Sequence, residues 1–167
     1  MTDARNIEAA LEQVLGSTSD PGNGLSDPVF TFVLKVTPMI NVDLLVRDDA
    51  GRTLLAWRED AYGTGWHIPG GIVRYREPIK NRIAAVARLE FGATVEAEQD
   101  PCAVTEFCHT LRGHFISLMY RCSLTSEFET LGLIFREGRP QHGMISWIKG
   151  VPTELYPAHQ VYEEWLR

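Results

Sequence analysis

One stretch of the sequence decides the fold: residues 65–93 read GWHIPGGIVRYREPIKNRIAAVARLEFGA. The paired glycines Gly70-Gly71 let the backbone approach a ligand closely and present a carbonyl or an amide to it. A helix is predicted over residues 78–91, because proline is favoured in a first turn and Gly92 lies just past the last one. Glu90, near the C-terminal end, opposes the helix dipole, and a bound cation would offset that cost. A solvated surface glutamate is the alternative; with the glycines in the same stretch, we expect Glu90 to bind a divalent metal ion.

Strands are expected on both sides of this segment, and two helices should cover the resulting sheet. The fold class is therefore α+β with a mixed β-sheet. Residues 1–24 are interpreted as an N-terminal arm and linker, and residues 25–167 as the folded domain. The predicted helices are 7–15, 27–35, 78–91 and 157–167, and the predicted strands are 39–47, 52–58, 66–73, 93–108, 114–124 and 144–149.

Composition narrows the function classes. The net charge of -6 argues against nucleic-acid binding, which needs a basic face. No segment approaches the roughly 20 apolar residues of a membrane span, and the N-terminus lacks the apolar run of a signal peptide. The three cysteines have no C-x-x-C spacing, which favours a reducing compartment. We therefore expect a cytoplasmic protein without a nucleic-acid or membrane partner.

The central stretch resembles the Nudix box, G-x5-E-x7-R-E-U-x-E-E-x-G-U, in which U is an aliphatic residue. The W-x-I-P-G-G sequence that precedes it is a typical Nudix lead-in. Three charged positions of the box are missing here. The matching residues are Gly71, Glu77, Glu90, Gly92 and Ala93, and the departures are Ala85, Val86 and Leu89.

A second motif is similar to one branch of that family, the GDP-mannose mannosyl hydrolases. Gln141-His142 followed by Trp147 matches the Q-H-x4-W of the branch, which also lacks the same two box glutamates. The resemblance covers nearly everything from about Leu25 onward. It implies the Nudix fold, a mixed β-sheet sandwiched between α-helices, and a homodimer whose subunits complete each other's sites. It also implies release of GDP from GDP-mannose or GDP-glucose by water attack on the anomeric carbon.

The resemblance further implies roles for individual residues. One Mg²⁺ or Mn²⁺ ion is expected. Closely spaced divalent ions would repel each other, and this chain lacks the carboxylates that would offset the repulsion. The implied metal ligands are the Gly70 carbonyl, Glu90 and Gln141. The implied catalytic residues are His142 as general base, Arg58 on the leaving diphosphate and Asp43 near the sugar. The implied substrate-binding residue is His109. Arg74 and Arg76 are expected to restore part of the phosphate binding that the family arginines supply, because strand alternation places both on the face opposite Val73 and Tyr75.

Alternative interpretations remain open at this level. The branch carries arginines where this chain has Ile72 and Ala85, so turnover itself is in question. A conventional Nudix pyrophosphohydrolase would attack phosphorus, and a nucleotide-sugar sensor would bind without turnover. No residue in the sequence distinguishes one base or one sugar from another. The remaining histidines, His67, His114 and His159, are interpreted as structural.

Overall fold

The computed structural model describes residues 2–18, 20–110, 112–129 and 133–167, without the side chains of residues 2–5 and of His109. The α-helices are α1 (Thr2–Ser17), α2 (Asp27–Val36), α3 (Ile79–Phe91) and α4 (Glu163–Leu166), and the 3-10 helices are η1 (Pro21–Asn23) and η3 (Pro157–Tyr162). The strands are β1 (Met39–Val46), β2 (Thr53–Asp60), β3 (Gly63–His67), β4 (Gly70–Ile72), β5 (Val95–Ala97), β6 (Ala103–Thr110), β7 (Gly113–Leu124) and β8 (Ile145–Ile148).

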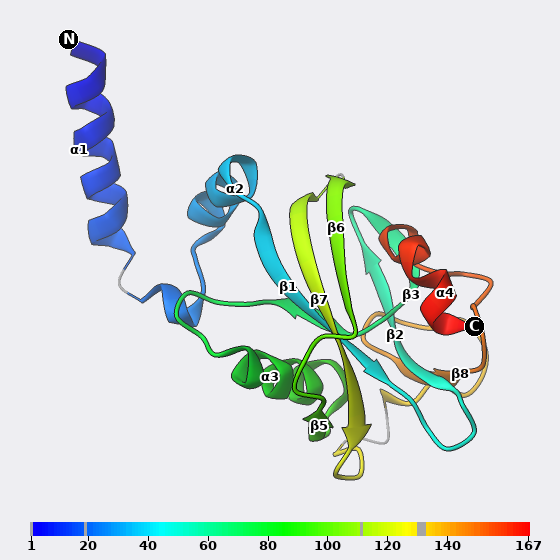
Figure 1. The fold of residues 1–167 in the computed structure, drawn as a ribbon. Coiled ribbons are helices and arrows are strands. Elements are labelled where there is room, and N and C mark those ends of the chain that lie inside the picture. The colour runs from blue at the N-terminus through cyan, green and yellow to red at the C-terminus, as the bar shows by residue number, and fades with distance from the viewer. Residues whose placement is uncertain (1, 19, 111, 130–132) are drawn as a thin grey trace.

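The strands form two sheets. The larger one runs β4-β1-β7-β5, with β6 also paired to β7, and it is mixed because β1 and β7 are parallel. The smaller sheet runs β3-β2-β8 and is antiparallel. Helix α3 packs against β1, β4 and β5, and η3 and α4 lie beside the smaller sheet (Figure 1). This arrangement confirms the expected α+β fold with a mixed sheet between helices.

Strand β1 separates two apolar cores. Val42, Leu44 and Val46 belong to the core that α3 covers, whereas Leu45 belongs to the core beneath η3 and α4. Side chains along a strand alternate between faces, so a run of apolar residues serves both layers. Helix α3 contributes its own apolar stripe at helical spacing: Ile83, Val86, Ala87 and Phe91. The glycine turn pairs with β1 and α3 packs against it, so β1 positions both parts of the central stretch.

Three predicted elements differ from the structure. The strand expected over residues 66–73 is the end of β3 and then β4, which belong to different sheets. The strand expected over residues 93–108 is two strands, β5 and β6, because Asp100-Pro101 interrupts it and proline cannot donate to a strand ladder. The closing helix expected over residues 157–167 is η3 followed by a single turn of α4. Within the residues that the structure describes, no helix combines the length and apolar character that crossing a membrane requires.

Candidate functional site

A cavity of about 1250 Å³ opens between the two sheets and the N-terminal segment. Its wall includes polar groups from β1, β2, β3, α3 and the turn after β4. Four arginines contribute to it, which favours an anionic ligand. Residues Leu15, Pro21 and Gly24 also line it, so the predicted arm forms part of the wall. The polar and charged lining includes Asp43, Arg58, His67, Arg74, Arg82, Glu90, Arg112, Ser117, Tyr156 and His159.

The glycine turn lies against β1 with no room for a side chain. Gly70 pairs with Asp43 across the strands, and a Cβ built on Gly70 would lie 2.1 Å from Asp43 Oδ1. A Cβ on Gly71 would lie 2.9 Å from a methyl carbon of Val86. A real Cβ does not come this close to another atom, so a side chain at either position would force its neighbours to move; at Gly70 these include the backbone carbonyl oxygen of Val42, at 2.8 Å. Val86, at a box position that usually carries a carboxylate, is therefore packing beneath the turn.

Glu90 faces a buried histidine across the cavity floor. The distance between Glu90 Oε2 and His67 Nε2 is 3.7 Å, too long for a hydrogen bond. His67 Nδ1 lies 2.7 Å from the carbonyl oxygen of Ala56, and because a carbonyl only accepts, Nδ1 carries the proton. The other ring nitrogen, Nε2, is buried and has no hydrogen-bond partner among the residues that the structure describes. An unpartnered lone pair beside a carboxylate is a donor pair that suits a cation.

The protonation states agree with that interpretation. Burial lowers the pKa of His67, and the Arg58 charge lowers it further, although Glu90 opposes both effects. Burial would raise the pKa of Glu90, but His67, Arg58 and His142 outweigh it and leave that pKa below its ordinary value. Near neutral pH the pair is thus a neutral imidazole and a carboxylate, the forms in which both bind metal ions.

Arg58, on β2, is half-buried in the same wall. Its Nε lies 4.0 Å from Asp60 Oδ2, and its guanidinium carbon lies 5.8 Å from the centre of the Tyr156 ring. The Tyr156 hydroxyl donates to Asp60 Oδ1 at 2.8 Å. Burial and the neighbouring Asp60 raise the pKa of Tyr156 to about 12, so it stays a neutral donor. Because this ion pair is long, most of the Arg58 N–H groups can still bind an anionic ligand.

Asp43 is buried beneath the glycine turn. Its Oδ2 accepts hydrogen bonds from Ser117 Oγ at 2.5 Å and from the Tyr162 hydroxyl at 2.7 Å, and Asn41 Nδ2 donates to Oδ1 at 3.0 Å. Burial raises the pKa of Asp43 despite these three donors. The network fixes the floor on which Gly70 rests, while Asp43 also lines the cavity.

Gln141 and His142 lie on the loop before β8, and both are exposed. This loop pairs with β2: Gly143 N donates to the Trp57 carbonyl oxygen at 2.9 Å, and the backbone N–H of Glu59 donates to His142 Nδ1 at 3.2 Å. Neither Gln141 nor His142 lines the cavity. Their roles as metal ligand and general base stay predictions.

The two arginines that follow the glycine turn, Arg74 and Arg76, have different surroundings. Arg74 lines the cavity, and its Nη1 lies 3.4 Å from the carbonyl oxygen of Gly22. Arg76 has a positive φ of 58° and stacks 5.0 Å from the Tyr75 ring centre, outside the cavity. This corrects the expectation that strand alternation places both on one face, because β4 ends at Ile72 and the chain then turns. The side chain of His109 lies outside the described residues.

Arg82 and Arg112 also line the cavity, and no motif in the sequence indicates either of them. Arg82, on α3, donates from Nε to Glu77 Oε2 at 2.8 Å, and Glu77 also accepts from the backbone N–H of Arg74 at 2.9 Å. These bonds tie the turn to the helix and, against the effect of burial, lower the pKa of Glu77. Arg112 follows β6, 5.8 Å from the Phe115 ring centre. Only tertiary structure brings Arg112 to this wall, because it lies far along the chain from the box.

Solved structures share this fold at low sequence identity. The MutT Nudix hydrolase of Burkholderia pseudomallei is 20% identical, with a TM-score of 0.62, over 78% of this chain and 99% of its own. A UDP-X diphosphatase is 17% identical, with a TM-score of 0.57, over 96% of this chain and 75% of its own. The MutT protein of Methanosarcina mazei Go1 is 22% identical, with a TM-score of 0.52, over 68% of this chain and 78% of its own. The chain has the fold of the Nudix hydrolases.

Sequence comparison gives a partial match. No family model matches the chain. The low-salt glycan biosynthesis protein Agl8 of Haloferax volcanii is 32% identical over 79 residues, which is 47% of this chain. The match spans 50% of the length of that curated relative.

Proposed function

We propose that this chain is a hydrolase of a nucleoside-diphosphate sugar of the GDP-mannose or GDP-glucose type, dependent on one Mg²⁺ or Mn²⁺ ion. The observation that carries the proposal is one cavity that holds the Glu90 carboxylate beside the guanidinium of Arg58, over a turn that only glycine fits. A carboxylate suits a divalent ion, and guanidinium groups suit the diphosphate oxygens. The names of two similar proteins, a UDP-X diphosphatase and a glycan biosynthesis protein, support a nucleotide-sugar substrate.

The residues present fit a divalent ion. Glu90, the carbonyl of Gly70 and Gln141 would hold it, with Gln141 assigned from the sequence motif alone. His67 is a further donor, because its buried Nε2 has no other partner and lies 3.7 Å from Glu90. Two donor atoms each about 2.1 Å from an ion are separated by up to about 4.2 Å, so an ion fits between these two. When bound, the ion would stabilise the departing diphosphate.

The reaction we propose is water attack on the anomeric carbon, with His142 as general base. Arg58, and the neighbouring Arg74 and Arg112, would bind the diphosphate. Asp43 would lie beneath the sugar, where a carboxylate favours developing positive charge. In this proposal Arg82 takes the place of the box arginine that Ala85 lacks, although part of its charge is engaged by Glu77.

A second candidate is pyrophosphate hydrolysis by attack on phosphorus. It is favoured by the position of His142, which is exposed and outside the cavity lining. Hydrolysis in ¹⁸O-labelled water distinguishes the two, with mass analysis of the products. Label in the free sugar supports attack at carbon. Label in a phosphate product would refute attack at carbon and establish the second candidate.

A matched pair of variants tests the site itself. Glu90→Gln should abolish metal-dependent hydrolysis, whereas Glu96→Gln, an exposed glutamate on β5, should retain it. A panel of nucleotide sugars with product identification by NMR would determine the base and the sugar. Tight binding of a nucleotide sugar without turnover in Mg²⁺ and Mn²⁺ would refute a hydrolase and indicate a sensor.

We also propose that the chain forms a homodimer in the cytoplasm. Helix α1 projects from the body of the molecule in Figure 1, and its apolar positions Ile7, Leu11 and Leu15 are exposed. An apolar stripe of this kind is buried at low cost against a second copy. Because Leu15 also lines the cavity, a partner on α1 would lie near the substrate entrance.

A further inference from the structure

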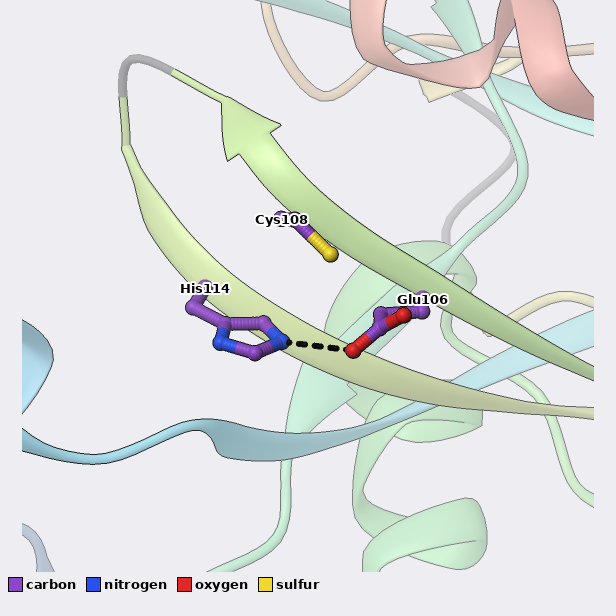
Figure 2. Close-up of side chains that lie close together, drawn as sticks. All are labelled: Glu106, Cys108 and His114. Atoms are coloured by element: carbon purple, nitrogen blue, oxygen red, sulfur yellow. Dashed lines mark hydrogen bonds and ion pairs between the residues drawn. The ribbon is translucent and has the colours of Figure 1, made fainter.

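The hairpin of β6 and β7 carries a second cluster of metal-binding side chains. Glu106 and Cys108 lie on β6, and His114 lies on β7; Figure 2 shows the three side chains gathered together. One ligand atom from each lies within 4.8 Å of the other two. His114 Nε2 and Glu106 Oε1 are 3.2 Å apart. Three donors of different chemistry thus converge from two neighbouring strands.

Strand geometry explains the convergence. Phe107 pairs with Phe115 across the two strands, and both side chains line the cavity. Neighbours along a strand point to the opposite face, so Glu106, Cys108 and His114 lie on the reverse side of the cavity wall. The pairing register shifts by a β-bulge after Phe107. A bulge bends its strand and redirects the side chains beside it.

The dimensions suit a tetrahedral ion. Around Zn²⁺ the ligand distances are about 2.3 Å to sulfur and about 2.0–2.2 Å to nitrogen or oxygen, so ligand atoms lie roughly 3.4–3.6 Å apart. The ligand atoms of the cluster all lie within 4.8 Å of one another, so the longest separation needs to close by at most about 1.4 Å. Glu106 and Cys108 are exposed, so rotation about their side-chain bonds can supply that movement.

The local charge also favours a cation. A Cys108 thiolate would lie beside the Glu106 carboxylate, so the two negative charges would repel each other. A divalent cation between them would convert this repulsion into attraction. Thiolate is a ligand that Zn²⁺ prefers and Mg²⁺ does not, and the Cys108 sulfur distinguishes this cluster from the site at Glu90.

We propose that Glu106, Cys108 and His114 bind one Zn²⁺ ion, which fastens β6 to β7 behind the cavity wall. Binding replaces the thiol proton of Cys108, which leaves to solvent, and forms bonds from sulfur, nitrogen and oxygen to the ion. The fourth position of the ion is taken by water. The ion is structural: it restrains the hairpin whose opposite face presents Phe107 and Phe115 to the cavity.

The experiment uses the full chain carrying Glu90→Gln, stripped of metals by a chelator, so that the proposed catalytic ion does not contribute. Titration with Co²⁺ is followed by the thiolate-to-cobalt charge-transfer absorption, and Zn²⁺ affinity is measured by calorimetry. Cys108→Ser and His114→Gln test the cluster. Cys102→Ser is the matched control, because Cys102 is a partly buried free cysteine outside it.

We expect one ion per chain and a charge-transfer band that persists in Cys102→Ser and disappears in Cys108→Ser. His114→Gln should weaken Zn²⁺ binding at least ~10-fold, a loss seen even when partners outside the ligand set are removed. Absence of the band from the parent protein, or its persistence in Cys108→Ser, would overturn the proposal. One ion per two chains would also overturn it, since the ion would then bridge two copies. All of these outcomes are independent of whether the chain hydrolyses nucleotide sugars.

Discussion

Two buried histidines should make the fold sensitive to mild acid. Burial lowers the pKa of His67 and lowers that of His159 well below 6.5, and the nearby Arg58 charge lowers both further. His159 Nδ1 accepts a hydrogen bond from the backbone N–H of Ile68 at 3.2 Å, a bond that a proton on Nδ1 would break. In the unfolded chain each histidine takes up a proton near its ordinary pKa of 6.5. The unfolded state therefore binds more protons below that pH, and stability falls as the pH falls.

The size of the effect follows from linkage. One pH unit below the unfolded pKa, a histidine that stays neutral in the folded state costs about 1.4 kcal/mol of stability. His159 should supply that full amount at about pH 5.5, and His67, which Glu90 partly stabilises in its charged form, at most the same. Burial raises the pKa of Asp43, which contributes with the opposite sign: its protonation in the folded state favours folding as the pH falls.

Urea denaturation followed by tryptophan fluorescence, at about pH 7.5 and about pH 5.5 and constant ionic strength, measures the loss. The informative comparison is His159→Gln, whose side-chain oxygen can still accept the Ile68 N–H. Asp43 and His67 are present in both proteins, so their contributions cancel. Between the two pH values His159→Gln should lose about 1.4 kcal/mol less stability than the parent. Equal losses in the two proteins would refute the assignment of a buried neutral ring at this position.

Three further predictions concern the glycine turn, the cavity and the dimer. Gly70→Ala should cost about 1–3 kcal/mol in urea denaturation and weaken Mn²⁺ binding, because its Cβ would overlap Asp43; Gly16→Ala, with open space around it, should cost nothing. Arg58→Ala should weaken binding of a nucleoside diphosphate, measured by calorimetry, by roughly 1.5–3 kcal/mol, and unchanged affinity would remove Arg58 from the site. Leu11→Glu should halve the mass measured by light scattering if α1 forms the dimer interface; an unchanged dimer would place the interface elsewhere.

Much of the fold could be predicted because local patterns determined it. The apolar stripe of α3, the hairpin turn before β2 and the glycine after Phe91 are all readable in the sequence. Pro101 is also readable in the sequence, and because proline interrupts a strand ladder it indicates the break between β5 and β6. The 3-10 geometry of η3 was not readable, because its spacing of apolar residues also suits an α-helix.

The candidate site was less predictable, because tertiary contacts create most of it. Gly70 and Glu90 belong to one motif, and the structure places both at the cavity. Arg112 reaches the same wall only through the β6–β7 hairpin, which no local pattern reveals. The sequence alone favours a structural role for His67, because a lone histidine in an apolar stretch usually has one. Its unpartnered Nε2 depends on which ring nitrogen Ala56 engages, and that is a property of the folded β2–β3 pair.

His67 and His142, whose charges both act on Glu90, carry their protons on opposite ring nitrogens, and this bears on the reaction. His142 Nδ1 accepts the Glu59 N–H, so the neutral ring carries its proton on Nε2 and has no lone pair there to receive another. His67 donates from Nδ1, which leaves its Nε2 lone pair facing Glu90. To act as a base, His142 must first leave the Glu59 amide, a movement that substrate binding would have to drive. If His142 is the base for attack at the anomeric carbon, as we propose, that reaction requires a rearrangement of the loop before β8, whereas attack at phosphorus without His142 does not. The position of the ¹⁸O label consequently reports on this loop as well as on the bond that breaks.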